Sequence, residues 1–402
     1  MNVISSQQLG ERLADARKRT KLTQAQVAEQ VGVARTTLVA VEKGERRPSN
    51  DELMRLGRVL GIPIHDLLRE SYVRTDLSPR FRLGGGNQNI PAIAEAVERL
   101  RVLAARYVEL ERLHGLRRAP APLETVQTYR ADLEGGRVLD PQLAGEDAAR
   151  AIRAMLGLGD EPALGLEARF EAEAGLRIFF LDRLPGTVSA FLIWSDEVGA
   201  CVAVNSAHPP EKRRWSLAHE MGHFLRDREA GDVLDDATPL KHPSEIFPET
   251  FTKEFLLPAT GVQKRFAERC RAGKFTPIDL YGLAQTFEVS FEAMTRRLEE
   301  LRLLPRGSYE KIVHSRLRPS ELSKHHPKQE SLAIPPLGLP ERYIALAVSA
   351  YDQELLSERE FAEYLGTDVV SSRVVFSGRQ RIPLEDGSQL PVDFAAADLR
   401  SA

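Results

Sequence analysis

The chain has 402 residues and a formal net charge of −3, and 42% of its residues are hydrophobic and 28% charged. This length exceeds what one core usually serves, so two to four domains of a water-soluble protein are expected. No apolar run reaches about 18 residues and the first residues lack the layout of a signal peptide, so we predict no membrane span and a cytoplasmic location. The two cysteines, Cys201 and Cys270, are too few for a disulfide framework or a cysteine-ligated zinc site.

Charge is unevenly distributed along the chain. Residues 1–70 hold 12 Lys and Arg against 9 Asp and Glu, a net charge of +3, whereas the remaining 332 residues hold 43 against 49, a net charge of −6. A small basic module therefore precedes a mildly acidic body, and only the module has the charge expected for binding nucleic acid.

Residues 8–69 are predicted to form short helices joined by tight turns, because apolar residues recur there at helical spacing. Thr23 and Gln26 have the pattern of a capping box that starts a helix over 23–30. A second helix, over 34–42, follows after only the turn around Gly32. Two helices joined so closely must cross at a large angle, which is the geometry of a helix-turn-helix.

The second of these helices is predicted to meet DNA. Its inward face is apolar, and the outward side chains that are free to reach base edges in a major groove include Arg35, Thr36 and Thr37. The basic residues that cluster after it suit contacts with phosphate and are Lys43, Arg46 and Arg47. The predicted partner is therefore double-stranded DNA.

This segment resembles the XRE family of phage-repressor-like helix-turn-helix domains. The residues that carry the resemblance are Leu22-Thr23-Gln24, Ala28, Gly32-Val33, the Glu42-x-Gly44 close, Pro48 and the helix from Leu53 to Leu60. The resemblance implies an all-α DNA-binding domain over 1–70, in which Gln24 contacts the DNA backbone and the 34–42 helix reads bases. We expect the protein to act as a homodimer.

The rest of the chain alternates helical and strand-like patterns. We predict a linker over 74–90, a long amphipathic helix over 91–118, an irregular segment over 119–145, a helix over 146–156, and strands over 176–181, 188–194 and 199–204. Further helices are predicted over 211–226 and 249–257, and two more over 277–304. Residues 305–340 are predicted as loop and 340–370 as helices, with Ser357 and Glu360 as a capping box, and 371–402 give no readable signal.

The pattern His219-Glu220-Met221-Gly222-His223 is an H-E-x-x-H run on a predicted helix. Residues i and i+4 of a helix lie on one face, so the imidazoles of His219 and His223 can bind one metal ion. Glu220 lies beside them without being a ligand and can accept a proton from a water at the metal. Zinc is the expected ion, because it leaves an open tetrahedral position for that water.

Residues from about 148 to 300 resemble the ImmA/IrrE family of bacterial metallopeptidases. The resemblance rests on the strand Val188-Ser189-Ala190-Phe191, on Val204-Asn205-Ser206, on the run from Arg213 to Glu220, on Phe251, on Glu254-Phe255-Leu256-Leu257-Pro258 and on the helices over 278–304. It implies a zincin-like α+β fold, zinc bound by two histidines and a downstream glutamate, and the glutamate after the first histidine as the catalytic base. Members of that family cleave XRE-type repressors.

The third ligand departs from the family pattern. The pattern places a glutamate eleven residues before the proline that is Pro258 here, and that position is Phe247. We take Glu249 as the predicted ligand, because Pro248 could begin a helix and leave Glu249 in its first turn. Glu245 is the substitute if it lies in a loop that reaches the metal. In the third alternative Phe247 fills the pocket and the domain is a degenerate zincin.

The sequence therefore predicts an α+β multidomain regulator. Its parts are a helix-turn-helix domain over 1–70, a linker and long helix over 71–145, a zinc metallopeptidase-like domain over 146–304 and a mostly helical C-terminal region over 305–402. Two functional hypotheses stay open. In one, a Zn²⁺-dependent peptidase cleaves a repressor-type protein; in the other, the peptidase-like domain is a non-proteolytic sensor or scaffold. No membrane partner is expected.

Overall fold

The computed structural model describes residues 5–20, 22–60, 67, 90–116, 140–227, 243–270, 274–314, 336–383 and 389–391. Its contacts divide the chain into two compact units, Met1–Arg74 and Thr75–Ala402. The linker predicted over 74–90 lies outside the described residues, apart from its last residue. Within the described part of the chain, no helix is long and apolar enough to cross a membrane.

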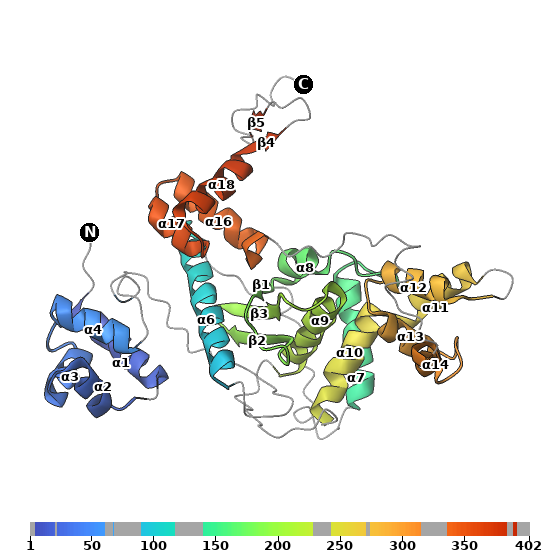
Figure 1. Ribbon diagram of the computed structural model, residues 1–402, viewed down its shortest axis with the longest axis horizontal. Helices are drawn as coiled ribbons and strands as arrows, with labels where there is room; N and C mark the ends of the chain where they lie inside the picture. The colour runs from blue at the N-terminus through green and yellow to red at the C-terminus, as the bar shows by residue number, and fades with distance from the viewer. Residues whose placement is uncertain are drawn as a thin grey trace. The chain divides into compact units, whose positions relative to one another are not determined.

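The first unit is the predicted all-α module (Figure 1). Its helices are α1 (Ser6–Arg19), α2 (Gln24–Val31), α3 (Arg35–Glu42) and α4 (Asn50–Leu60). The capping box of Thr23 and Gln26 is present, and Gly32 ends α2 with a φ of 74°, which favours glycine. A small core formed by all four helices holds α2 and α3 in the helix-turn-helix arrangement.

The second unit combines helices with two small sheets. Its elements before the metal-motif helix are α6 (Ile90–Leu113), α7 (Pro141–Met155), α8 (Leu166–Arg169), the π-helical turn η3 (Phe170–Ala174), β1 (Arg177–Leu181), β2 (Ala190–Ser195) and β3 (Gly199–Asn205). Then come α9 (Pro210–Asp227), α10 (Pro243–Leu256), α11 (Ala259–Arg269), α12 (Pro277–Thr286), α13 (Phe291–Glu300) and α14 (Ser308–His314). The C-terminal elements are η4 (Pro336–Gly338), α16 (Glu341–Asp352), α17 (Glu358–Tyr364), α18 (Val369–Gln380), β4 (Arg381–Pro383) and β5 (Gln389–Pro391).

Three predicted boundaries were wrong. Helix α7 begins at Pro141, inside the segment expected to be irregular, because Asp140 caps it and proline suits a first helical position. Helix α10 begins at Pro243 and carries Pro248 inside it, rather than beginning at Pro248. Residues 308–314, expected as loop, form α14. The three predicted strands are confirmed with shifts of one or two residues.

The three-stranded sheet has the order β1-β3-β2, with β1 parallel and β2 antiparallel to β3. Its side chains alternate between two covered faces. Ile178 and Val202 belong to the core on the α9 side, whereas Phe179 and Arg177 contact side chains of α16 and α6. Figure 1 accordingly shows the sheet between α6 and α9.

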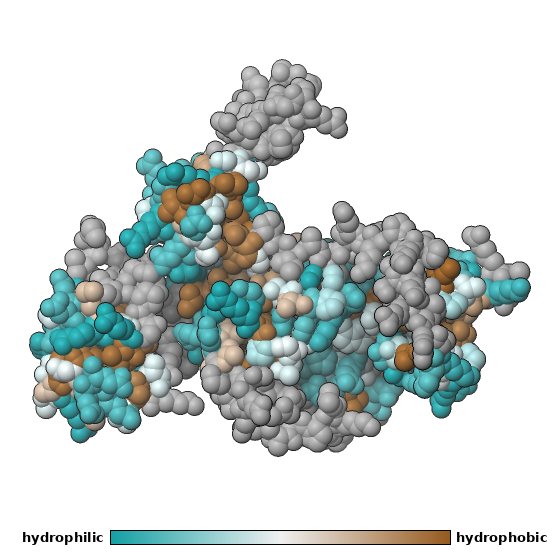
Figure 2. Space-filling model, in the orientation of Figure 1, coloured by the Kyte–Doolittle hydropathy of each residue, from teal (hydrophilic) through white to brown (hydrophobic). Residues whose placement is uncertain are grey.

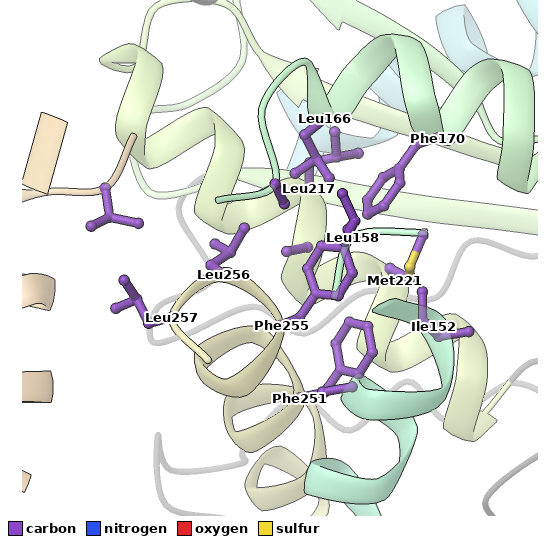
Figure 3. Close-up of a cluster of buried hydrophobic side chains, with 14 of the residues drawn as sticks. Ile152, Leu158, Leu166, Phe170, Leu217, Met221, Phe251, Phe255, Leu256 and Leu257 are labelled. Carbon is purple, nitrogen blue, oxygen red and sulfur yellow. The ribbon is translucent and has the colours of Figure 1, made fainter. Parts of the chain in front are cut away.

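The main core lies where α7, α9 and α10 pack together. Figure 3 shows Ile152 of α7, Met221 of α9 and Phe251 and Phe255 of α10 meeting there. The rings of Phe251 and Phe255 are stacked, with centroids 5.4 Å apart. This apolar contact fixes one face of α10 against the other two helices, which decides where its remaining faces point.

One buried arginine joins the C-terminal ends of α7 and α10. The guanidinium of Arg153 donates to the backbone carbonyls of Gly159 at 2.8 Å, and of Phe255 and Glu161. Burial lowers the pKa of Arg153 to about 10, and the three carbonyls satisfy its buried donors. This end of the α7–α10 pair is therefore held by hydrogen bonds as well as by packing.

Helix α6 joins the sheet to the C-terminal helices. Glu111 of α6 is buried and accepts from Arg177 of β1 at 2.8 Å and from Arg342 of α16. The Arg177 guanidinium lies 4.2 Å from the ring centroid of Tyr107, and burial raises the pKa of Tyr107 to about 12. Further along, Arg106 pairs with Glu363 of α17 at 3.1 Å.

The C-terminal helices confirm the helical prediction over 340–370. Ser357 and Glu360 form the predicted capping box. Figure 2 shows apolar side chains on the surface of this region, and among its described residues Val370 and Val374 are each 69% exposed. The role of the region stays a prediction.

Glu171 offers a test of the contact between η3 and α16. Its carboxylate accepts the backbone N–H of Glu341 at 3.3 Å, and burial together with Glu341 and Glu167 raises its pKa to about 7. The folded state therefore binds this proton more tightly than the unfolded state, whose glutamate has its ordinary pKa of about 4.5. Stability is consequently lost as the pH rises from about 4.5 to 7.

We expect Glu171→Gln to remove this loss, because glutamine keeps the acceptor without the charge. The gain in unfolding free energy should be absent near pH 4 and reach about 3 kcal/mol at pH 8. Chemical denaturation at several pH values measures it. Glu173 lies two residues further along and is exposed, so Glu173→Gln is the matched control and should change the unfolding free energy little. A gain for Glu171→Gln that is the same at all pH values would contradict this account.

Candidate metal centre and DNA-binding surface

Helix α9 presents both motif histidines at one edge of the core. Leu217, Met221 and Phe224 are buried, which fixes the rotation of the helix. The side chains of His219 and His223 then lie at the boundary, 23% and 19% exposed. Their Nε2 atoms are 3.2 Å apart, so both imidazoles are directed at one point, as the i, i+4 spacing predicts.

Helix α10 brings a carboxylate to the same point. Glu245 Oε2 lies 3.2 Å from His219 Nε2 and 3.5 Å from His223 Nε2. Glu245 lies in the first turn of α10. Among the described residues, these three side chains form the group that could hold a metal ion.

The structure corrects the prediction of Glu249. This residue lies one turn further along α10 with an exposed side chain, and it is not part of the cluster. The prediction depended on a helix that begins at Pro248, whereas α10 begins five residues earlier, at Pro243. That extra turn places Glu245, which was expected in a loop, beside the two histidines.

Phe247 does not fill the site. Its side chain is buried in the core, on the side of α10 away from Glu245, as two residues on a helix are about 200° apart. The rotation along the helix thus separates Glu245 from Phe247 and directs it toward α9. The alternative with Phe247 in the pocket is therefore not supported by the positions of these side chains.

The donor atoms fit a tetrahedral zinc ion. Ligands at about 2.0–2.2 Å with tetrahedral angles are about 3.3–3.5 Å apart, and the three separations here are 3.2, 3.2 and 3.5 Å. Protons cannot satisfy all three contacts, because an Nε2 that carries a hydrogen cannot also accept one. A cation at the centre satisfies all of them, and two nitrogens with one oxygen are typical zinc ligands.

Glu220 follows the first histidine and stays outside the triangle. Burial raises the pKa of its carboxyl, and the neighbouring His223 opposes that shift. Its side chain is not among the three that cluster. The role of Glu220 as catalytic base stays a prediction.

Those of the other histidines that the structure describes are not part of this group. His208 lies after β3, with Nε2 3.2 Å from the carbonyl of Gly186. His242, His325 and His326 lie outside the described residues. Cys201 is fully buried in β3, as expected for a core residue.

The first unit displays the residues predicted to meet DNA. Leu38 and Val41 of α3 face the core, whereas Arg35 and Thr36 are exposed and Thr37 is half-buried. The basic residues Lys43, Arg46 and Arg47 are exposed after α3. Arg46 pairs with Glu52 of α4 at 3.0 Å, so its position is set by the module itself.

Gln24 is held at the start of α2 by the end of α3. Its Nε2 donates to Glu42 Oε2 at 2.8 Å, and Arg17 of α1 binds the same carboxylate through Nε at 2.6 Å. The carboxylate of Glu42 thus ties three helices together. Contact between Gln24 and the DNA backbone stays a prediction.

Comparison with known protein families assigns both parts of the chain. Residues 13–67 match the helix-turn-helix family model, and residues 171–299 match a peptidase family model described as the IrrE N-terminal-like domain. Both resemblances drawn from the sequence are thereby confirmed. Comparisons with curated proteins and with solved structures find no significant match.

Proposed function

Starting from a chain that joins a helix-turn-helix domain to an IrrE N-terminal-like domain, we propose a DNA-binding transcriptional regulator with a zinc-dependent peptidase site. His219, His223 and Glu245 hold the zinc ion and Glu220 is the catalytic base. The substrate is a protein of the XRE repressor type, by analogy with the family. The observation that carries the proposal is the triangle of donor atoms, with sides of 3.2, 3.2 and 3.5 Å.

The zinc ion and Glu220 have different roles in the proposed peptide hydrolysis. Zinc, when bound, polarises a carbonyl and makes a water more acidic. Glu220 accepts the proton of the attacking water and returns it to the leaving amide nitrogen. A carboxylate is suited to both steps, because it can accept a proton and then donate it.

The second hypothesis, a sensor or scaffold, needs the histidines and Glu245 but not Glu220. The deciding experiment therefore measures zinc content and cleavage separately. Wild type is expected to hold about one zinc ion per chain and to cleave an XRE-type repressor. Glu220→Gln is expected to keep the zinc and to lose cleavage by at least about 100-fold, because general-base catalysis is removed while the ligands remain.

Each outcome has one meaning. Wild type without zinc would overturn the metal site. Zinc without cleavage of any tested repressor would favour the sensor. Equal cleavage by Glu220→Gln and wild type would show that the glutamate is not the base.

The DNA-binding proposal assigns base contacts to Arg35, Thr36 and Thr37 and phosphate contacts to the basic cluster after α3. Arg46→Ala is then expected to weaken binding to all sequences and to lower the slope of log affinity against log salt by about one. Fluorescence anisotropy over a salt series measures both. Arg58→Ala removes an exposed charge from α4 instead and should leave the slope unchanged.

Equal slopes for wild type and Arg46→Ala would contradict the phosphate contact. A homodimer on two half-sites is part of the same proposal, because paired helix-turn-helix domains meet the two halves of a palindrome. Sedimentation with and without DNA tests it.

A further inference from the structure

Helix α10 lies against a glycine on each of its neighbours. A Cβ atom at Gly222 of α9 would lie 2.8 Å from the Cα of Pro248. A Cβ at Gly145 of α7 would lie 2.9 Å from the carbonyl oxygen of Phe247 and 3.0 Å from the Cβ of Thr250. Real Cβ contacts essentially never fall below 3.0 Å, so both close approaches require glycine.

The two glycines meet the part of α10 between Glu245 and its C-terminal end. Gly222 approaches Pro248, three residues after Glu245, and Gly145 approaches Phe247, Thr250 and the backbone nitrogen of Phe251. Arg153 holds the C-terminal end of α10 through the carbonyl of Phe255, whose ring also packs in the core. A Cβ atom at Gly145 would therefore push the part of α10 next to Glu245 away from α7 while the C-terminal end stays held.

A small tilt matters at the metal. Relief of the contact requires a shift of a few tenths of an ångström or more. Metal–ligand distances must lie within about 0.2 Å of their ideal values. The carboxylate of Glu245 would therefore leave the point on which His219 and His223 converge.

We infer that Gly145 is a positioning residue of the metal centre: the absence of a side chain on α7 lets α10 approach closely enough to place Glu245 beside the histidines. Gly145 lies outside the segment that matches the peptidase family model, residues 171–299. Helix α7 thus helps to position a ligand of the proposed metal site. This inference rests on the proposed zinc site.

The test compares Zn²⁺ affinity of the full-length wild type and Gly145→Ala by competition with a chelator. The expected loss is about tenfold to 100-fold, the range for residues that orient a ligand without touching the metal. Cobalt-substituted protein adds a second readout, because its visible absorption depends on coordination geometry. The spectrum of Gly145→Ala is expected to differ from that of wild type, while far-ultraviolet circular dichroism stays the same.

Two other glycines provide matched controls. Gly378 in α18 has open space around its Cβ position, so Gly378→Ala should leave both fold and zinc affinity unchanged. Gly261 in α11 is more restricted than Gly145, since its Cβ would lie 2.0 Å from the carbonyl oxygen of Asp160, and its nearest neighbours, in Asp160 and Pro258, lie outside α10. Gly261→Ala should therefore destabilise the unit and leave the zinc affinity of the folded fraction near that of wild type.

The outcomes separate this inference from the proposed function. Wild type that binds no zinc overturns the proposed site. Equal zinc affinities of wild type and Gly145→Ala would overturn the role of Gly145. Equal losses of zinc affinity in Gly145→Ala and Gly261→Ala would overturn it as well. If Gly145→Ala lowers the folded fraction, the zinc affinity of its folded fraction is compared with that of the folded fraction of Gly261→Ala, and a greater loss in Gly145→Ala is still expected.

Discussion

Replacement of Glu245 by alanine is expected to lower the zinc affinity by about 100-fold or more. Only two imidazoles then remain, whereas three protein ligands and a water are the usual catalytic arrangement. The expected loss exceeds that of residues that merely orient a ligand, for which about 10- to 100-fold is typical. Chelator competition on the purified protein measures the dissociation constants of wild type and variant.

Glu249→Ala is the matched control for this experiment. It removes a carboxylate from the same helix, one turn away and exposed, and should change the affinity less than about threefold, as expected for a distant surface charge. An equal or larger drop for Glu249→Ala would restore Glu249 as the ligand. No drop in either variant would mean that α10 supplies no ligand, and the sensor hypothesis would then be preferred.

The H-E-x-x-H pattern could be located from the sequence because its information is local. His219 and His223 are four residues apart, and any helix puts them on one face. The strands could be predicted equally well, because β1 and β3 are short, largely apolar runs between turns. The capping boxes at Thr23 and Ser357 also depend only on residues three apart.

The third ligand could not be fixed in this way. Its identity depends on where α10 begins, and helix starts are the least certain part of a sequence-based prediction. Pro248 indicated a start at that residue, since proline favours the first turn. The close approach of α9 and α7, through Gly222 and Gly145, holds α10 as a continuous helix across Pro248, and this tertiary effect leaves no local pattern.

The contacts on the second face of the sheet could not be predicted from the sequence either. Glu111 was one charged residue of a long amphipathic helix, and Arg342 lies in the predicted C-terminal region. Their meeting with Arg177 of β1 joins three segments that are far apart in the chain. Helix α6 is therefore more than a connection between the DNA-binding module and the peptidase-like domain, because it covers one face of the sheet.

Glu111→Gln is expected to lower the unfolding free energy of the second unit by about 3–5 kcal/mol. The change leaves the guanidinium of Arg177, whose side chain is 7% exposed, without its counter-charge, and an unpaired buried charge has a cost of this size. Arg342 adds less, because its side chain is 52% exposed. Both tryptophans of the chain, Trp194 and Trp215, lie in this unit, so tryptophan fluorescence during urea unfolding reports on it alone.

The control uses another ion pair of the same helix. Arg112 of α6 pairs with Glu197 at 3.3 Å, and both side chains are more than a third exposed. Glu197→Gln should therefore cost at most about 1 kcal/mol. The double variant Glu111→Leu/Arg177→Met should recover most of the stability lost in Glu111→Gln, because apolar pairs of similar volume can replace buried ion pairs. If Glu111→Gln costs no more than Glu197→Gln, the carboxylate does not hold α6 on the sheet, and apolar packing of α6 alone must do so.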